Sequence, residues 1–273
     1  MSFASVSVAQ SIGIRAGLNY SQFNGALEPG ESYGLTGGFH FGFNYGYKFS
    51  RELSLRFELL YSQIGSRYEF QGDSYYVIYF SSERTIYEPG KKEIRLDISN
   101  AYVNLPITLN YQISNKFELF GGLGASFLVN PTANGKLRFE SHSRPEDIVF
   151  RQGLDYRYYS DEARGGQFVR NRELAIIVDE NIVTLPRFAG AYYQFENKKR
   201  SQLSFFDVQA TVGVNYFFNK GLFVGLRLDK GLLDVMRNDM HPSQVSFKPE
   251  GGLIFRESKE TNLSYQISIG FRF

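Results

Sequence analysis

The chain has 273 residues, of which 16% are aromatic, 27 are glycine and none is cysteine or tryptophan. The absence of cysteine excludes a disulfide scaffold, a thiolate metal site and a cysteine nucleophile. With 30 basic and 28 acidic residues, the formal net charge of +2 gives no electrostatic case for nucleic-acid binding. No run of about 18 apolar residues predicts a transmembrane helix.

Small residues near the N-terminus resemble a signal-peptidase cleavage site. Ser7, Val8 and Ala9 precede Gln10, which places small side chains at the two positions that the peptidase reads. The basic region and longer apolar core of a whole export signal are missing from this stretch. We interpret residues 1–10 as the remnant of an export signal or an N-terminal tail. Residues 11–273 are then expected to form a single domain.

Strict alternation of apolar residues with small or polar ones predicts eight β-strands. The second strand is the clearest, because every second residue from Phe39 to Phe49 is aromatic. Most predicted strands have 10 to 14 residues, whereas a globular strand averages about 5–6 and a membrane-spanning one needs about 9–11. In chain order they cover residues 12–20, 39–50, 53–62, 103–113, 117–129, 206–218, 222–229 and 262–273.

The connections between these strands alternate between tight and long. Tight turns are predicted near residues 50–52, 114–116 and 219–221, and the largest insertion covers about 130–205. Short turns at one end and long loops at the other are typical of outer-membrane barrels. The predicted fold class is therefore all-β: an eight-stranded antiparallel up-and-down transmembrane β-barrel with long extracellular loops.

Parity along the predicted hairpins tests this interpretation. Residues that face each other across a hairpin share one side of the sheet. The pairs Phe49–Leu53, Ile113–Phe117 and Phe218–Leu222 then require three-residue turns, and Gly221 suits a left-handed conformation in the last of them. The same register places residues on the polar face opposite one another: Gly46 and Arg56, Thr108 and Gly122, Pro106 and Gly124, Gly213 and Arg227, Asn215 and Gly225.

Long side chains opposite glycines fit the narrow interior of an eight-stranded barrel, which has room only for side chains. We therefore expect the polar face to point inward and the aromatic face to point toward lipid. A soluble barrel, the alternative, would crowd six aromatic side chains of one strand into its interior. Pro106 cannot donate a hydrogen bond within its predicted strand and indicates a β-bulge.

Three segments carry a resemblance to a known family. They are YVNLPITLNYQISNKFELFGGLGASFLV (102–129), FDVQATVGVNYFFNKGLFVGLRLDKGLLDV (206–235) and NLSYQISIGFRF (262–273). They resemble the outer-membrane β-barrel family of Bacteroidota that includes PorT-like proteins, and Phe273 resembles the aromatic C-terminus of such barrels. The resemblance implies an eight-stranded barrel in the outer membrane of a Gram-negative bacterium, in contact with membrane lipid and lipopolysaccharide. Some members of the family serve the type IX secretion system.

A set of charged residues falls on the predicted inward face. A near balance of sign predicts a plug of paired charges, because an unpaired charge in a dry interior costs several kcal/mol. The alternative is a selectivity path for ions in a narrow channel. The residues of this expected lumen charge network are Arg15, Lys48, Arg56, Glu58, Glu118, Asp207, Arg227, Asp229 and Arg272.

The sequence predicts no catalytic site, no cofactor and no metal site. The three histidines, His40, His142 and His241, are scattered and lack a nearby carboxylate at metal-ligand spacing. His40 lies at an inward position near the outer rim, and the pattern shows no partner for it. A lipid A-modifying enzyme that uses His40 is the least favoured of the functional hypotheses.

Arginine and tyrosine are concentrated in the large insertion, a composition typical of protein interfaces. Residues 174–186 predict a hairpin turning at Asp179-Glu180, and residues 75–80 predict a strand in the preceding long loop. Together they predict a projecting sheet that binds a partner, and the alternative is a lid over the barrel mouth. The candidate partner-binding residues are Arg151, Tyr156, Tyr158, Tyr159, Arg170, Tyr192 and Tyr193.

A ten-stranded barrel would use residues 167–178 and 182–195 as two further spanning strands. Alternation is poor there, and basic residues would face lipid at a cost of about 2–4 kcal/mol each. Eight strands are therefore expected. The function predicted from the sequence is a non-enzymatic accessory or scaffold barrel that binds a protein partner through its extracellular loops, a type IX secretion component by resemblance. The alternative is a narrow outer-membrane channel.

Overall fold

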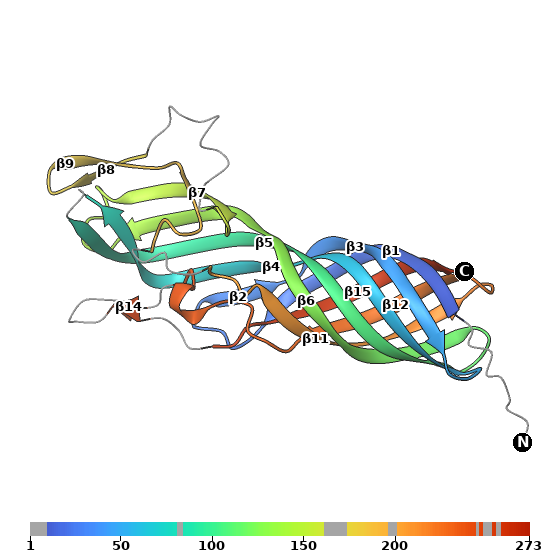
Figure 1. Ribbon diagram of the computed structural model, residues 1–273. Helices are drawn as coiled ribbons and strands as arrows, with labels where there is room; N and C mark the ends of the chain where they lie inside the picture. The colour runs from blue at the N-terminus through green and yellow to red at the C-terminus, as the bar shows by residue number, and fades with distance from the viewer. Residues whose placement is uncertain are drawn as a thin grey trace, which may run out of the picture.

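The computed structural model describes residues 10–80, 84–160, 174–195, 201–243, 246–247, 253–254 and 258–273. Eight long antiparallel strands wind around one axis, and the start of β1 lies at the same end of the molecule as the C-terminus (Figure 1). Each of these strands pairs with two others of the eight, and the last pairs with the first, so the sheet closes on itself. They are β1 (Gln10–Asn24), β3 (Thr36–Lys48), β4 (Leu53–Tyr79), β5 (Thr85–Gln112), β6 (Phe117–Ser141), β11 (Phe206–Phe217), β12 (Leu222–Gly231) and β15 (Thr261–Arg272).

The predicted alternation of the barrel strands is confirmed. In β3 the aromatic residues point outward, with Phe43 61% exposed, while Asn44 beside it is 6% exposed. The cross-strand pairs predicted from parity are also confirmed, including Gly46 with Arg56 and Gly213 with Arg227. Glycines opposite long side chains let eight strands enclose a filled interior. No helix among the described residues is long and apolar enough to cross a membrane, a finding that does not bear on crossing by strands.

The three tight turns share one side-chain device. Ser50 Oγ accepts hydrogen bonds from the backbone N–H groups of Glu52 and Leu53 at 3.2 and 3.0 Å. Ser114 Oγ and Asn219 Oδ1 accept the equivalent pairs in the other two turns. Short polar side chains of this kind close a turn by mimicking a backbone carbonyl.

The role predicted for Gly221 is wrong. Among the described glycines only Gly30 has a positive φ, of 85°. Since Asn219 closes the turn with its side chain, position 221 has no need of the left-handed region. A Cβ at Gly221 would instead come within 2.6 Å of the Phe271 ring and 2.7 Å of the Arg272 carbonyl. Close approach to β15 is therefore what favours glycine here.

The β-bulge predicted at Pro106 is wrong, because the irregularity of this strand lies at another position. Pro106 pairs in register with Gly124 of β6, and the β4–β5 ladder shows only a gap between Phe57–Ile107 and Leu60–Asn104. The missing N–H of proline leaves a hydrogen bond unmade without displacing the strand. The register shifts instead at Ala101/Tyr102 of β5, opposite the outer end of the barrel part of β6.

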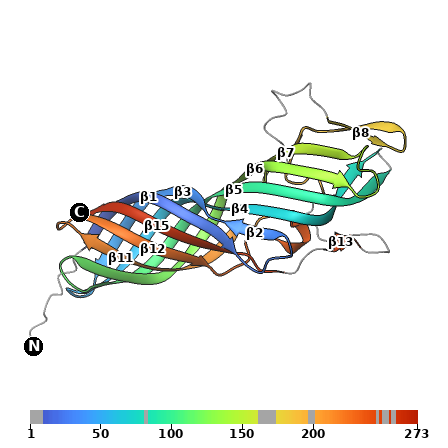
Figure 2. The ribbon, with the colours of Figure 1, turned by 180° about the vertical axis from the view of Figure 1, so that it is seen from behind.

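Strands β4, β5 and β6 continue well beyond the barrel, as the predicted projecting sheet requires (Figures 1 and 2). Their 27, 28 and 25 residues far exceed the length of about 9–11 residues that spans a membrane. We call this part the extension. Its sheet also includes β2 (Glu31–Gly34), which pairs with β4, β7 (Val149–Arg157), which pairs with β6, and β10 (Phe188–Ala189), which pairs with β7.

The chemistry of the two strand faces inverts where the extension begins. Along β5, Leu105 and Ile107 face outward in the barrel, whereas Arg95 occupies the outward face of the extension. The inward face changes from Asn104 in the barrel to Ile98 in the extension, and both side chains are buried. Lipid contacts the outer surface of the barrel, and water contacts that of the extension. The apolar residues of the alternation therefore face outward in the barrel and inward in the extension.

The buried face of the extension is covered by chain segments that return over it. These segments include the hairpin of β8 (Leu174–Val178) and β9 (Asn181–Leu185) and the connection after β12 that holds η2 (Asn238–Met240). The small β13 (Ser246–Phe247) and β14 (Leu253–Ile254) pair with each other. Ile176, Leu185 and Met236 are each 1% exposed against this core.

The strands β8 and β9 pair only with each other among the described residues, which excludes them as spanning strands of a ten-stranded barrel. The predicted hairpin is confirmed, and it turns at Asp179 and Glu180, whose φ angles of 49° and 64° define a tight turn. Residues 167–173, the rest of the first additional strand considered, lie outside the described residues, as do residues 1–9 of the expected signal remnant.

Candidate functional site

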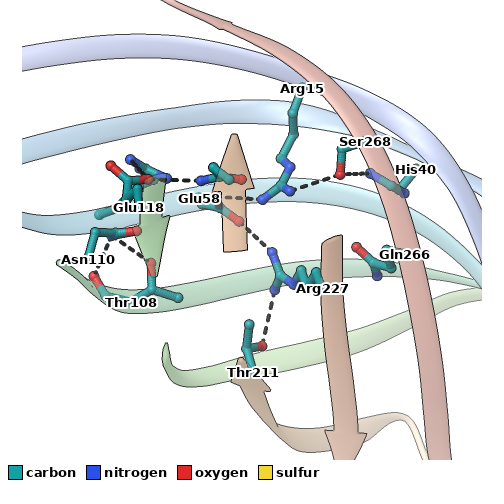
Figure 3. A network of polar contacts seen from close by, with 12 residues as sticks. Arg15, His40, Glu58, Thr108, Asn110, Glu118, Thr211, Arg227, Gln266 and Ser268 are labelled. Atoms are coloured by element: carbon teal, nitrogen blue, oxygen red, sulfur yellow. Dashed lines mark hydrogen bonds and ion pairs between the residues drawn. The ribbon is translucent and has the colours of Figure 1, made fainter. Parts of the chain in front are cut away.

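The lumen contains an ion-pair cluster built around Glu58 (Figure 3). Arg15 of β1 and Arg227 of β12 reach its two carboxylate oxygens, with N–O distances of 3.2 and 2.6 Å. Arg227 Nε also donates to Asp229 at 2.8 Å, and Asp229 accepts from Gln266 Nε2 at 2.8 Å. Two cations and two anions are thus fully buried together and balance in charge.

A second cluster is built around Glu118 at the start of β6. Arg56 and Arg272 donate to its carboxylate at 2.9 and 2.7 Å, and Asn215 Nδ2 donates at 2.8 Å. The Arg272 guanidinium also lies 4.6 Å from the ring centre of Phe217. Glu118 on β6 and its partners on β4, β11 and β15 thus link four strands of the barrel at this level.

Two members of the predicted lumen network lie outside both clusters. Lys48 is exposed at the end of β3, because the strand ends at the rim and the side chain reaches water there. Asp207 is buried near the outer mouth, where it accepts from Asn262 Nδ2 at 3.2 Å and from the backbone N–H of Leu233 at 3.1 Å. Asp207 therefore binds the chain segment after β12 rather than an arginine.

Aromatic side chains complete the filling of the lumen. Phe120, Phe217 and Phe223 are 6%, 5% and 2% exposed, and the last two rings lie 5.3 Å apart. The alternation within residues 117–129 and 222–229 places Phe120 and Phe223 on the inward face. Their position on the otherwise small and polar face was the signal that they fill space between the charge clusters.

His40 has two hydrogen-bond partners that the alternation pattern did not indicate. Its Nδ1 lies 2.6 Å from Asn19 Oδ1 and its Nε2 lies 3.1 Å from Ser268 Oγ (Figure 3 shows the serine contact). This connectivity is that of a nucleophile, a base and an orienting group. However, Ser268 and His40 are 2% and 1% exposed, and Arg15 already donates to Ser268 Oγ at 2.8 Å. The serine hydroxyl and the imidazole are therefore both buried, and this chain of hydrogen bonds is part of the filling of the lumen.

Three of the tyrosines expected to bind a partner are buried. Tyr156, Tyr158 and Tyr192 are 6%, 2% and 5% exposed. They belong to the apolar core of the extension, where Tyr192 Oη donates to the Tyr158 carbonyl at 2.7 Å. The prediction that they form an exposed interface is wrong, because each ring covers the buried face of the extension sheet. Burial raises the pKa values of the Tyr156 and Tyr158 hydroxyls, because the charged form loses its hydration.

Of the other four candidate partner-binding residues, the three that the structure describes are not part of this buried group. Arg151 is exposed on β7. Tyr159 follows the other end of β7 and is 55% exposed, and its hydroxyl donates to the Leu128 carbonyl at 2.7 Å. Tyr193 is half-buried and packs against Tyr79 with ring centres 5.7 Å apart. Arg170 lies outside the described residues.

The β8–β9 hairpin at the far end of the extension has apolar residues on both of its faces, one buried and one exposed. One face packs inward, where Val178 is fully buried. The other face carries Ile177 and Ile182, which lie directly opposite each other and are 46% and 75% exposed. Exposed apolar side chains in adjacent positions are a common feature of protein-binding surfaces.

A buried lysine lies within the core of the extension. Lys92 is 1% exposed, and its Nζ donates to the Tyr75 carbonyl at 3.4 Å. Burial lowers its pKa to about 7, because the charged form loses its hydration. The neighbouring Lys91 is exposed to water on the opposite face of the same strand.

A closed antiparallel barrel with an apolar outer band and buried polar side chains inside defines an integral membrane β-barrel of the bacterial outer-membrane type. The chain belongs to the outer membrane protein beta-barrel domain family, whose sequence model matches residues 8–237. The protein is therefore an outer-membrane β-barrel, with its short turns on the periplasmic side and the extension outside the cell.

Several solved outer-membrane proteins are similar to this chain at low identity. Ail, the attachment invasion locus protein of Yersinia pestis, has 12% identity over 96% of this chain and 98% of Ail, with a TM-score of 0.39. OprG from Pseudomonas aeruginosa has 11% identity, 97% coverage of both chains and a TM-score of 0.39. Neisserial surface protein A has 9% identity, covers 96% of this chain and 95% of its own, and has a TM-score of 0.37. No curated protein sequence matches the chain.

Proposed function

We propose that this outer-membrane barrel is a non-enzymatic accessory protein that binds a protein partner through the outer end of its extension. The observation that carries the proposal is the exposed pair Ile177 and Ile182 on the β8–β9 hairpin, which lies at the end of the extension away from the barrel (Figure 1). Apolar side chains at a rigid, outlying position offer a partner a surface that needs no rearrangement.

Ion pairs hold this hairpin in place. The Asp179 carboxylate at its turn accepts from Arg84 at 2.8 Å and from Arg144 at 3.1 Å. Arg144 also pairs with Glu88 of β5, and the Ile177 N–H donates to the Asp147 carbonyl at 3.3 Å. The hairpin is therefore preorganised, which reduces the conformational entropy lost when a partner binds.

The filled lumen argues for a scaffold rather than for a channel. Buried arginine–carboxylate clusters and three phenylalanine rings occupy the interior at successive levels. An eight-stranded barrel has no further room for a water path once such side chains are in place. The sealed Ser268–His40 contact likewise supports a role without catalysis.

The resemblance of residues 102–129, 206–235 and 262–273 to PorT-like proteins of Bacteroidota supports a partner from the type IX secretion system. The proposed partner would then be a component of a secretion system in the same membrane. It predicts that components of that system are recovered with the barrel.

Co-purification from the native outer membrane in mild detergent tests the proposal. The Ile177→Ser/Ile182→Ser variant should lose a stoichiometric partner that the wild-type protein retains. The Leu27→Ser variant is the matched control, because Leu27 is 53% exposed in the β1–β2 connection, away from the hairpin. A partner retained by the hairpin variant, or a wild-type barrel that purifies alone, would overturn the proposal.

A further inference from the structure

The outward face of the extension carries cations in an unfavourable arrangement. Arg95 of β5 lies directly opposite Lys136 of β6, and Arg138 of β6 lies directly opposite Arg151 of β7. Like charges in directly opposed positions of a sheet are destabilising. Two such pairs on neighbouring rows of one face therefore cost stability in the unliganded protein.

The carboxylates of this face neutralise only part of the charge. Arg138 pairs with Glu93 at 3.2 Å and with Glu140 at 3.1 Å, and Arg95 pairs with Glu69 at 3.7 Å. The other three cations make no ion pair with any residue that the structure describes, and all three are exposed to water: Lys136, Arg151 and Arg187.

These cations line a groove of about 770 Å³ on the extension. Its lining includes five basic side chains and one carboxylate, that of Glu93. Gly153 lowers the floor where β10 meets β7, and a Cβ there would come within 2.4 Å of the Phe188 ring. The groove thus combines a cationic wall with an aromatic ring set against a glycine.

We infer that this groove binds an anionic saccharide, meaning a sugar chain that bears phosphate, carboxylate or sulfate groups. Cations on adjacent strands lie about 5 Å apart and those two residues along a strand about 7 Å apart, so the site presents charges in an array. An array suits a ligand whose anions repeat along a chain, and guanidinium groups bind each such oxyanion with two hydrogen bonds. Phe188 supplies an apolar face for a sugar ring.

The position of the groove on the molecule agrees with this ligand. The extension begins where the outward face changes from lipid-facing residues such as Leu105 to charged residues such as Arg95. Sugar groups of the outer leaflet surround a protein at this level. An acidic peptide would most readily pair with a sheet edge, whereas the groove is lined by side chains on the face of β5, β6 and β7.

Titration calorimetry on the full chain in detergent micelles tests the inference with three probes. The probes are the delipidated saccharide of lipopolysaccharide, a heparin octasaccharide and polyglutamate. Lys136→Gln/Arg151→Gln should weaken binding of an anionic saccharide by about tenfold or more, since each lost charge-assisted hydrogen bond is worth that much. Arg67→Gln should change it less than about twofold, because Arg67 lies outside the groove and pairs with Asp97.

The arms of the experiment separate the sources of the ligand. Binding of the lipopolysaccharide saccharide alone assigns the groove to the cell's own surface, and binding of heparin as well assigns it to anionic sugars from either source. Binding should weaken as salt is raised, since exposed charges are screened. Three results would overturn the inference: no saccharide binding below about 1 mM, equal binding by the groove variant and the wild type, or polyglutamate binding as tight as that of either saccharide.

Discussion

Glu58 Oε2 of β4 accepts a hydrogen bond of 2.6 Å from Arg227 Nη1 of β12, which joins strands that do not neighbour each other in the barrel. Glu58 Oε1 accepts a second bond of 3.2 Å from Arg15. One carboxylate therefore holds two buried guanidinium groups, and together with Asp229 it supplies the negative charge that balances them in the lumen.

Removal of this charge should destabilise the barrel strongly. Glu58→Gln leaves two buried arginines facing a neutral amide, and we expect the free energy of unfolding to fall by about 3–5 kcal/mol. Urea unfolding in lipid vesicles measures the change. Arg67→Gln, which breaks a fully exposed pair with Asp97, should show no change beyond the error of the measurement. A loss below about 1 kcal/mol for Glu58→Gln would contradict a role of the cluster in holding the barrel together.

The lumen clusters should also block ion flow. In planar bilayers the wild-type protein is expected to give no unitary current steps, because charged and aromatic side chains fill the interior at successive levels. Arg227→Ala/Glu58→Ala removes two of the fillers together and is the variant in which a leak should first become measurable. Steps from the wild-type protein would restore the channel hypothesis.

Because the outward face is apolar in the barrel and charged in the extension, an outward valine-to-arginine substitution should destabilise the barrel but not the extension. Val212 is 56% exposed in the middle of β11, and Val149 is 47% exposed at the start of β7 in the extension. Val212→Arg should cost about 2–4 kcal/mol, because the charge would lie among lipid chains. Val149→Arg should change stability by less than about 0.5 kcal/mol. Equal effects would place the membrane boundary elsewhere.

Lys92 predicts a pH dependence of the extension. Since its pKa is about 7 in the folded protein and 10.5 when unperturbed, the unfolded chain binds more protons between these two values. Stability of the extension should therefore rise as pH increases from about 7, and the penalty of burying the charge should be fully present below pH 7. Pulse proteolysis in urea at pH 7 and pH 9 measures this difference.

Lys92→Met should remove the rise and stabilise the extension at pH 7. Lys91→Met is the matched control, because Lys91 neighbours it in sequence but faces water. The control should keep the wild-type pH dependence. An unchanged rise in Lys92→Met would show that another group titrates in this window.

The barrel was predictable because apolar residues alternate with small or polar ones at every second position of its strands. The aromatic stripe of β3 and the glycines opposite Arg56 and Arg227 fixed which face points inward, and register followed from three short turns. The ion pairs themselves were not predictable in detail, since parity gives the face of a residue but not its partner around the barrel. Asn19 and Ser268 reach His40 from strands far apart in sequence.

The extension was harder to interpret because its composition matches two opposite environments. Tyrosine is enriched both in interfaces and in aromatic cores, and only the covering segments decide that Tyr156 and Tyr158 are buried. A usable signal was present in residues 93–98, where charged and apolar residues alternate in the reverse sense of residues 104–109. That reversal marks both the membrane boundary and the buried face of the extension.

Site-specific photo-crosslinking in native cells tests the central claim most directly. A photoreactive residue placed at Ile182 should give a discrete adduct with one partner protein, and the same residue placed at Leu27 should give none. Both positions are exposed on the extracellular side, so they differ only in which surface they sample. Absence of an adduct at position 182, or the same adducts at both positions, would contradict binding of a partner by the β8–β9 hairpin.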